Sequence, residues 1–258
     1  MVKVQIFSKG KIENKNEDYF DYNETCFVIA DGATDNSGKK YDNKTGGELV
    51  SRIVVKECLS TDLNGIKLVN HLNNKVKQVY GNLKIIGDIQ DPKFRFTCGF
   101  ICIRIIDDKI LITYLGDLGF RINGSEIYQE TKQIDIDNSE ARSKYIRETN
   151  DIKGSRNHIM TLLLQQFEYQ NNPQEPLGYG VIDGKDTPAK FIKSFEYDLD
   201  KIHTIELFSD GYFDIPQEVS IEVWEKSFEK VEKEDPDKWK KYKSTKSKDD
   251  RTIVIIEF

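Results

Sequence analysis

Residues 204–211 read TIELFSDG, a mainly apolar run that stops at Asp210 and Gly211. The same arrangement recurs in FVIADG at 27–32 and in LITYLGD at 111–117. Short apolar runs bounded by glycine indicate buried β-strands. A buried strand carries its last side chain to the rim of the core, and glycine lets the backbone turn sharply there. The pattern therefore predicts strands that end in an aspartate at the edge of a sheet.

Further carboxylates stand beside other predicted strands. Glu17 and Asp18 precede one strand, and Asp249 and Asp250 precede the last one. A single Asp-Gly pair is ordinary turn chemistry, but several carboxylates gathered in one place repel each other unless cations neutralise them. Oxygen ligands without His or Cys favour Mg²⁺ or Mn²⁺, and the three histidines show no ligand spacing. Together these positions predict a metal site.

The rest of the chain mixes helix and strand patterns. Apolar spacing predicts helices at 46–59, 63–80 and 217–231. Turn residues at 107–108 and 123–124 predict two hairpins, and together these imply a four-stranded antiparallel meander. Other strands are expected at 2–7, 25–30, 179–182, 191–195, 202–208 and 252–258. This order predicts an α+β fold, a sandwich of two antiparallel β-sheets flanked by α-helices.

The segment 130–176 differs in character from its surroundings. Polar and charged residues dominate it, and only 158–167 shows a helical pattern. We expect an insertion or flap within a single domain that spans 1–258, because the strands that follow complete motifs begun before it.

Composition argues against some functions. The net charge of −6, from 38 basic and 44 acidic residues, disfavours a general affinity for nucleic acid. The basic run 238–248, with Trp239 and Tyr242 interleaved, lies beside the acidic stretch 225–237. We expect a solvated helix face there and not a nucleic-acid patch, with a docking surface for an acidic phosphoprotein as the intermediate alternative.

The four cysteines contain no CxxC pair, and three of them lie in apolar strand-like runs. This pattern predicts buried structural thiols in a reducing compartment. No apolar stretch approaches membrane-spanning length. We therefore expect a cytoplasmic protein that is not bound to a membrane.

The sequence resembles the PPM, or PP2C-like, family of metal-dependent serine/threonine protein phosphatases. The resemblance runs from residue 6 to residue 258 and rests on five short motifs in order. They are NED at 16–18, VIADG at 28–32, the span from FT at 96–97 to GD at 116–117, FSDGYFD at 208–214 and KDDRTIV at 248–254. Each motif is weak alone, and FSDGYFD is the most specific.

The resemblance implies a site with two divalent cations, Mn²⁺ or Mg²⁺. Asp31 would bridge the two ions, and Asp210 and Asp249 would complete one of them. Glu17 and the backbone carbonyl of Gly32 would help to hold the other. The same resemblance implies direct attack on phosphorus by a bridging water or hydroxide, without a phosphoenzyme.

Three further aspartates take roles by the same resemblance. Asp18 would orient metal-bound water, while Asp117 and Asp214 match positions that bind a third, weaker ion in some members. Asp250 becomes the ligand in place of Asp249 if the motif is shifted by one residue.

The chain departs from the family pattern at several positions. The family's phosphate-binding arginine, four residues before Glu17, is replaced by Glu13, which would repel a phosphate. Lys11 and Lys15 are either substitutes for it or part of a solvated loop. No histidine follows Asp31-Gly32, and 118–120 lacks the usual Ser-Arg. These changes leave the metal ligands intact but put the substrate in question.

We expect hydrolysis of phosphoserine and phosphothreonine in proteins by a monomer. Two alternatives remain open. One is a catalytically weak or inactive binding module with this fold, and the other is a phosphatase for a small phosphorylated molecule.

Overall fold

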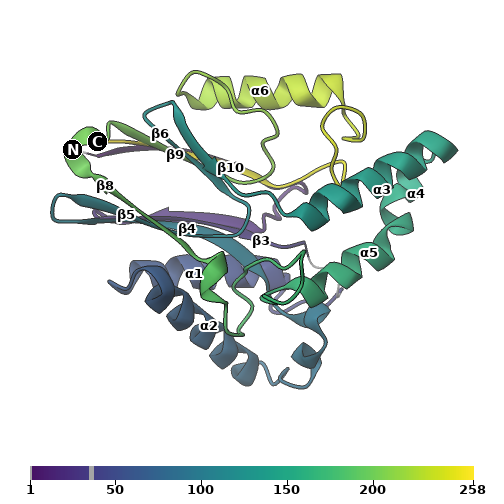
Figure 1. The fold of residues 1–258 in the computed structure, drawn as a ribbon, viewed down its shortest axis with the longest axis horizontal. Coiled ribbons are helices and arrows are strands. Elements are labelled where there is room, and N and C mark those ends of the chain that lie inside the picture. The colour runs from purple at the N-terminus through teal and green to yellow at the C-terminus, as the bar shows by residue number, and fades with distance from the viewer. Residues whose placement is uncertain (1, 35–37) are drawn as a thin grey trace.

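The computed structural model describes residues 2–34 and 38–258. It confirms the expected α+β sandwich, because two five-stranded antiparallel sheets face each other with helices outside them (Figure 1). The first sheet contains, in spatial order, β1 (Lys3–Lys9), β10 (Arg251–Glu257), β9 (Thr204–Phe208), β6 (Gly119–Ile122) and β7 (Glu126–Gln129). The second contains β2 (Asp18–Tyr22), β3 (Cys26–Gly32), β4 (Cys98–Ile106), β5 (Lys109–Leu115) and β8 (Lys193–Asp198).

The central strands are mainly apolar because both of their faces are buried. In β4, Phe100 and Cys102 pack toward the helices, whereas Ile101 and Ile103 enter the core between the sheets. Successive side chains of a strand point to opposite faces, so one continuous apolar run serves two cores. The sandwich therefore has four layers, in the order helix, sheet, sheet and helix.

Two helices cover the outer face of the second sheet. The helix α1 (Gly46–Leu59) has the predicted bounds, and a capping box between Thr45 and Glu48 starts it. The helix α2 (Gly65–Asn82) begins two residues later than expected. On the first sheet, α6 (Ile221–Glu234) packs against β10 and β1, and begins at the cap Ser220.

The expected four-stranded meander is wrong. Both hairpins form, but β4 and β5 belong to the second sheet and β6 and β7 to the first. The chain crosses between the sheets at Gly116, whose φ of +109° is a backbone conformation that favours glycine. A Cβ on Gly116 would also lie 2.7 Å from the Cα of Gly99. Turn residues specify each hairpin, but they do not say which sheet the next hairpin joins.

The segment 130–176 is more helical than its composition predicts. It contains α3 (Gln133–Thr149), α4 (Ile152–His158) and α5 (Met160–Gln165), which lie together at one end of the sandwich (Figure 1). The segment 158–167, predicted as one helix, is divided between the last residue of α4, the whole of α5 and the start of a 3₁₀ helix at Gln166–Tyr169. The buried face of α3 is mainly polar and includes Asn138 and Arg142, so it shows no apolar stripe in the sequence.

Two other expectations fail. The segment 179–182 is not a strand, because only isolated bridges tie Tyr179 to Gln170 and Ile182 to Cys98. The basic run 238–248 forms turns and bends instead of a helix. The four cysteines are buried thiols, as expected. Within residues 2–34 and 38–258, none of the helices combines the length and the apolar content of a membrane-spanning segment.

Candidate active site

The aspartates that end the apolar runs meet at one end of the sandwich. Asp31 lies in β3, Asp117 follows the crossing glycine after β5, and Asp210 follows β9. Asp249 comes just before β10, which runs antiparallel to β9. The start of β10 therefore lies at the same edge as the end of β9, which brings Asp249 beside Asp210.

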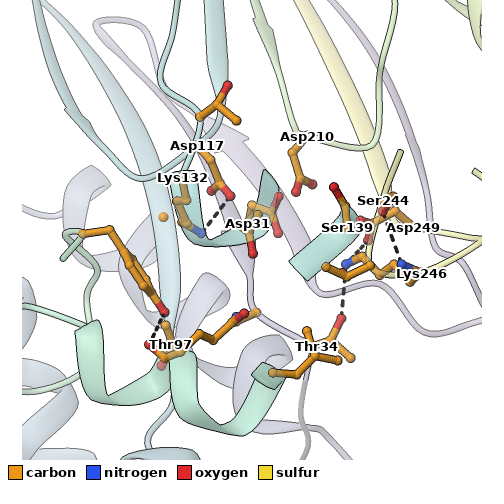
Figure 2. Close-up of a pocket in the computed structure, with 18 of the residues that line it drawn as sticks. Asp31, Thr34, Thr97, Asp117, Lys132, Ser139, Asp210, Ser244, Lys246 and Asp249 are labelled. Carbon is orange, nitrogen blue, oxygen red and sulfur yellow. Dashed lines mark hydrogen bonds and ion pairs between the residues drawn. The ribbon is translucent and has the colours of Figure 1, made fainter. Parts of the chain in front are cut away.

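These four aspartates line one cavity of about 360 Å³, together with Gly32. Figure 2 shows the side chains of Asp31, Asp117 and Asp210 directed toward a common space, with Asp249 at its edge. The sequence pattern predicted this gathering of carboxylates, and the fold produces it from four segments that are distant in the chain.

The cavity holds excess negative charge. Burial raises the pKa of Asp31 well above its usual range, and the carboxylates of Asp18 and Asp210 raise it further. Burial likewise raises the pKa of Asp210, with Asp249 as the next largest cause. Both effects disfavour the ionised carboxylates, so a cation in the cavity would stabilise them.

Two lysines supply part of the missing positive charge. The Nζ of Lys132 lies 2.7 Å from Oδ2 of Asp117, and the Nζ of Lys246 lies 2.6 Å from Oδ1 of Asp249 (Figure 2). Burial would lower the pKa of Lys246, but the carboxylates of Asp249 and Asp210 raise it above its usual value. Sequence reasoning missed both lysines, since neither belongs to a strand-end motif.

Asp18 lies behind the cavity, directly opposite Asp31 on the neighbouring strand. Its Oδ2 accepts hydrogen bonds of 2.8 Å from both Ser209 and Thr252, which ties β2 to the other sheet. Its Oδ1 is buried without a hydrogen-bond partner among the described residues. Burial raises the pKa of Asp18 to about 7, and the two hydroxyl donors limit that rise. An orphaned carboxylate oxygen at this position fits a nearby cation or water.

Glu17 does not line the cavity. Its Oε2 lies 2.6 Å from Nζ of Lys11, and its Oε1 accepts a 2.8 Å hydrogen bond from Thr45. Lys11 also pairs with Oδ2 of Asp250 at 2.9 Å. The side chain of Asp250 is thus directed toward Lys11, while Asp249 lines the cavity.

Asp214 is also away from the cavity. Its side chain is 41% exposed and pairs with Lys230 at 3.3 Å. Gly32 packs tightly, because a Cβ there would lie 2.4 Å from the backbone oxygen of Gly47. In the segment that follows, Ala33 and Thr34 line the cavity, and 35–37 lie outside the described residues.

The donor set fits a hard divalent cation by charge and by atom type, since it consists of carboxylate oxygens that repel each other. Within residues 2–34 and 38–258, no three His, Cys, Asp or Glu side chains are already arranged to hold a metal ion. Binding would therefore need side-chain movement, including separation of Lys246 from Asp249.

Comparison with known proteins gives matches in structure only. No family model and no curated protein matches the sequence. A bacterial serine phosphatase matches with a TM-score of 0.55 at 16% identity, covering 100% of this chain and 98% of that one. The Staphylococcus aureus serine/threonine phosphatase Stp1 gives 0.53 at 19% identity, with 100% and 95% covered.

A third structure matches, the catalytic domain of the serine/threonine protein phosphatase PstP in complex with two manganese ions. Its TM-score is 0.51 at 14% identity, with 99% and 97% covered. The chain has a PP2C-like phosphatase fold. In this PP2C-like fold, the residues that line the cavity come from the strand ends of both sheets and from α3, α4 and α5. Figure 1 shows these three helices together at one end of the sandwich.

Proposed function

We propose that this protein hydrolyses phosphate monoesters, with phosphoserine and phosphothreonine in proteins as its substrates. The observation that carries the proposal is the cavity lined by Asp31, Asp117, Asp210 and Asp249. Burial raises the pKa of Asp31 and Asp210, so the fold keeps carboxylates together at a cost that a bound cation would offset.

The acidic residues would have two roles, metal binding and orientation of water. Asp31, Asp210 and Asp249 would hold two divalent cations, Mn²⁺ or Mg²⁺, with the carbonyl of Gly32 and, after it leaves Lys11, Glu17. When bound, such cations lower the pKa of water and neutralise charge on phosphoryl oxygens. Asp18, fixed by Ser209 and Thr252, would orient the attacking water.

The structural matches support the substrate class and the metal. Stp1 and PstP are serine/threonine phosphatases, and the PstP structure contains two manganese ions. A third ion would use Asp117, which lines the cavity, with Asp214 turning in from the surface. We further propose a monomeric cytoplasmic enzyme with one domain, in which 130–176 is the flap.

Turnover of p-nitrophenyl phosphate and of a phosphothreonine peptide tests the proposal, with Mn²⁺, Mg²⁺ or EDTA present. The variant Asp210→Ala should reduce metal-dependent turnover by more than the roughly 10–100-fold that is typical when a residue supporting the metal ligands is removed. Asp108→Ala is the matched control, because Asp108 is exposed in the turn between β4 and β5. Equal turnover in EDTA and in Mn²⁺ would overturn the proposal.

A second candidate is a binding module without catalysis. It is favoured by the lysines, since Lys11, Lys132 and Lys246 already pair with carboxylates in or beside the cavity. In such a module these ammonium groups would replace metal ions permanently. A melting temperature that is unchanged by Mn²⁺, together with no turnover, would favour this candidate. Preference for small phosphate esters over the peptide would instead indicate a small-molecule phosphatase.

A further inference from the structure

The cavity has cationic as well as acidic walls. Four cationic side chains line it, namely Lys132, Arg156, Lys243 and Lys246. Three of them form ion pairs, Lys132 with Asp117, Lys243 with Glu140 and Lys246 with Asp249. Within the described part of the chain, Arg156 is the only cavity cation without a carboxylate at ion-pair distance. Its charge is thus available to a ligand.

The guanidinium of Arg156 keeps hydrogen-bond donors for such a ligand. Its Nη1 donates to the carbonyl of Thr245 at 3.0 Å, whereas Nε and Nη2 make no hydrogen bond to the described residues. Burial lowers its pKa, and the carboxylates of Asp249 and Glu17 oppose that change. Two donors in a planar fork match two oxygens of a phosphate group.

A buried scaffold holds Arg156 in place. The neighbouring Ser155 accepts a 3.0 Å hydrogen bond from Nε of Arg142, which is 1% exposed. The Nη1 of Arg142 donates to the carbonyls of Asp237, Lys238 and Ser244, and its Nη2 to Oγ of Ser247. One arginine therefore binds α3, α4 and the basic run 238–248 into a single wall of the cavity.

Residues 11–15 provide no cation to the cavity. Glu13 and Lys15 are exposed and do not line it. Lys11 is committed to Glu17 and Asp250 at 2.6 and 2.9 Å. The position at which the resemblance places a phosphate-binding arginine is thus acidic and outside the cavity, and its two neighbouring lysines do not replace it.

We propose that Arg156 binds the phosphate group of the substrate through Nε and Nη2. The basic run gains a role from this, since its Thr245 carbonyl orients the guanidinium. Recognition of the phosphate would then belong to α4 and the basic run, not to residues 11–15. This inference rests on the proposed function for its substrate, a phosphate monoester, but its test also works on protein without turnover.

The experiment compares wild type with Arg156→Ala, Arg156→Lys and the control Arg147→Ala. Arg147 is exposed in the last turn of α3, so its removal changes the net charge equally. Calorimetry measures the Kd of inorganic phosphate with Mn²⁺ present, and steady-state assays separate KM from kcat for p-nitrophenyl phosphate. The melting temperature checks folding, and Arg156→Lys keeps a donor for Thr245.

Arg156→Ala should raise both Kd and KM by about tenfold or more, a factor equivalent to one charge-assisted hydrogen bond. Arg156→Lys should fall between it and wild type, and Arg147→Ala should match wild type. Unchanged Kd and KM in folded Arg156→Ala would overturn the phosphate site but leave the proposed reaction intact. If phosphate binding depended on Arg156 but wild type showed no turnover, the phosphate site would be supported and the proposed reaction would be overturned. Wild type that neither binds phosphate nor turns over would overturn both.

Discussion

The buried ion pair beneath α6 offers a sharp test of what holds the first sheet together. Arg121 of β6 and Glu206 of β9 lie directly opposite each other, with side chains 2% and 0% exposed. Nη2 of Arg121 lies 2.6 Å from Oε1 of Glu206, and Trp224 of α6 donates to the same oxygen at 2.7 Å. The carboxylate thus depends on one cation and one indole.

The variant Arg121→Met should leave Glu206 charged, buried and without its cation. Breaking a pair of this kind costs about 3–5 kcal/mol, which corresponds to a fall in melting temperature of roughly 6–20 °C for a chain of this size. The double variant Arg121→Met/Glu206→Leu should recover more than half of this loss. It removes both charges and leaves the indole of Trp224 and the carbonyls of Pro216 and Glu218 without the partners they have in wild type.

Urea and thermal denaturation of the single and double variants measure this difference. The exposed pair Lys226–Glu222 on α6 is the control, with side chains 66% and 77% exposed. Lys226→Met should change the free energy of unfolding by no more than about 0.5 kcal/mol. If the single and double variants of the buried pair were equally unstable, desolvation of Glu206 would not be the cause and the reasoning would fail.

Three further predictions concern the site. Metal-free Asp31→Asn should melt at a higher temperature than wild type in EDTA, because burial and neighbouring carboxylates disfavour the ionised Asp31. Mn²⁺ should raise the melting temperature of wild type but not that of Asp31→Asn. Calorimetry measures both effects, and the reasoning fails if Asp31→Asn melts below wild type in EDTA or is stabilised by Mn²⁺. Metal-free wild type should lose stability as the pH rises from about 4 to about 7, because the pKa of Asp18 is about 7 in the folded protein and lower in the unfolded chain. The folded state binds the extra proton in this window, so urea midpoints should fall with pH, and rising midpoints would show the sign to be wrong. Thr45→Ala should cost about 1 kcal/mol by removing the cap of α1 and the hydrogen bond to Glu17, while Thr45→Ser should cost less.

Features with a local cause could be predicted from the sequence. The bounds of α1 follow from Thr45, Glu48 and the apolar spacing between Gly46 and Leu59, all within one helix length. The gathering of carboxylates could also be predicted, because a buried strand that ends in an aspartate places that side chain at the rim of the core.

Features that depend on distant partners could not be predicted. Nothing around Gly116 says that the chain leaves one sheet for the other there. The polar face of α3 becomes a buried face only because Arg142 finds carbonyl acceptors about a hundred residues away. Lys132 and Arg156 stand in a segment whose composition indicates only a polar insertion. Their place in the cavity is a property of the folded chain.

The pairing of β1 with β10 makes this cavity a late product of folding. Lys3 lies opposite Glu257, so the two strands that begin and complete the first sheet are separated by almost the whole chain. During synthesis β1 has no partner in this sheet until β10 has left the ribosome. Asp249 arrives with that same strand, so a nascent chain has neither a finished first sheet nor a complete set of carboxylates. Cation binding at this site would therefore report that β10 has joined the first sheet and has brought Asp249 to the cavity.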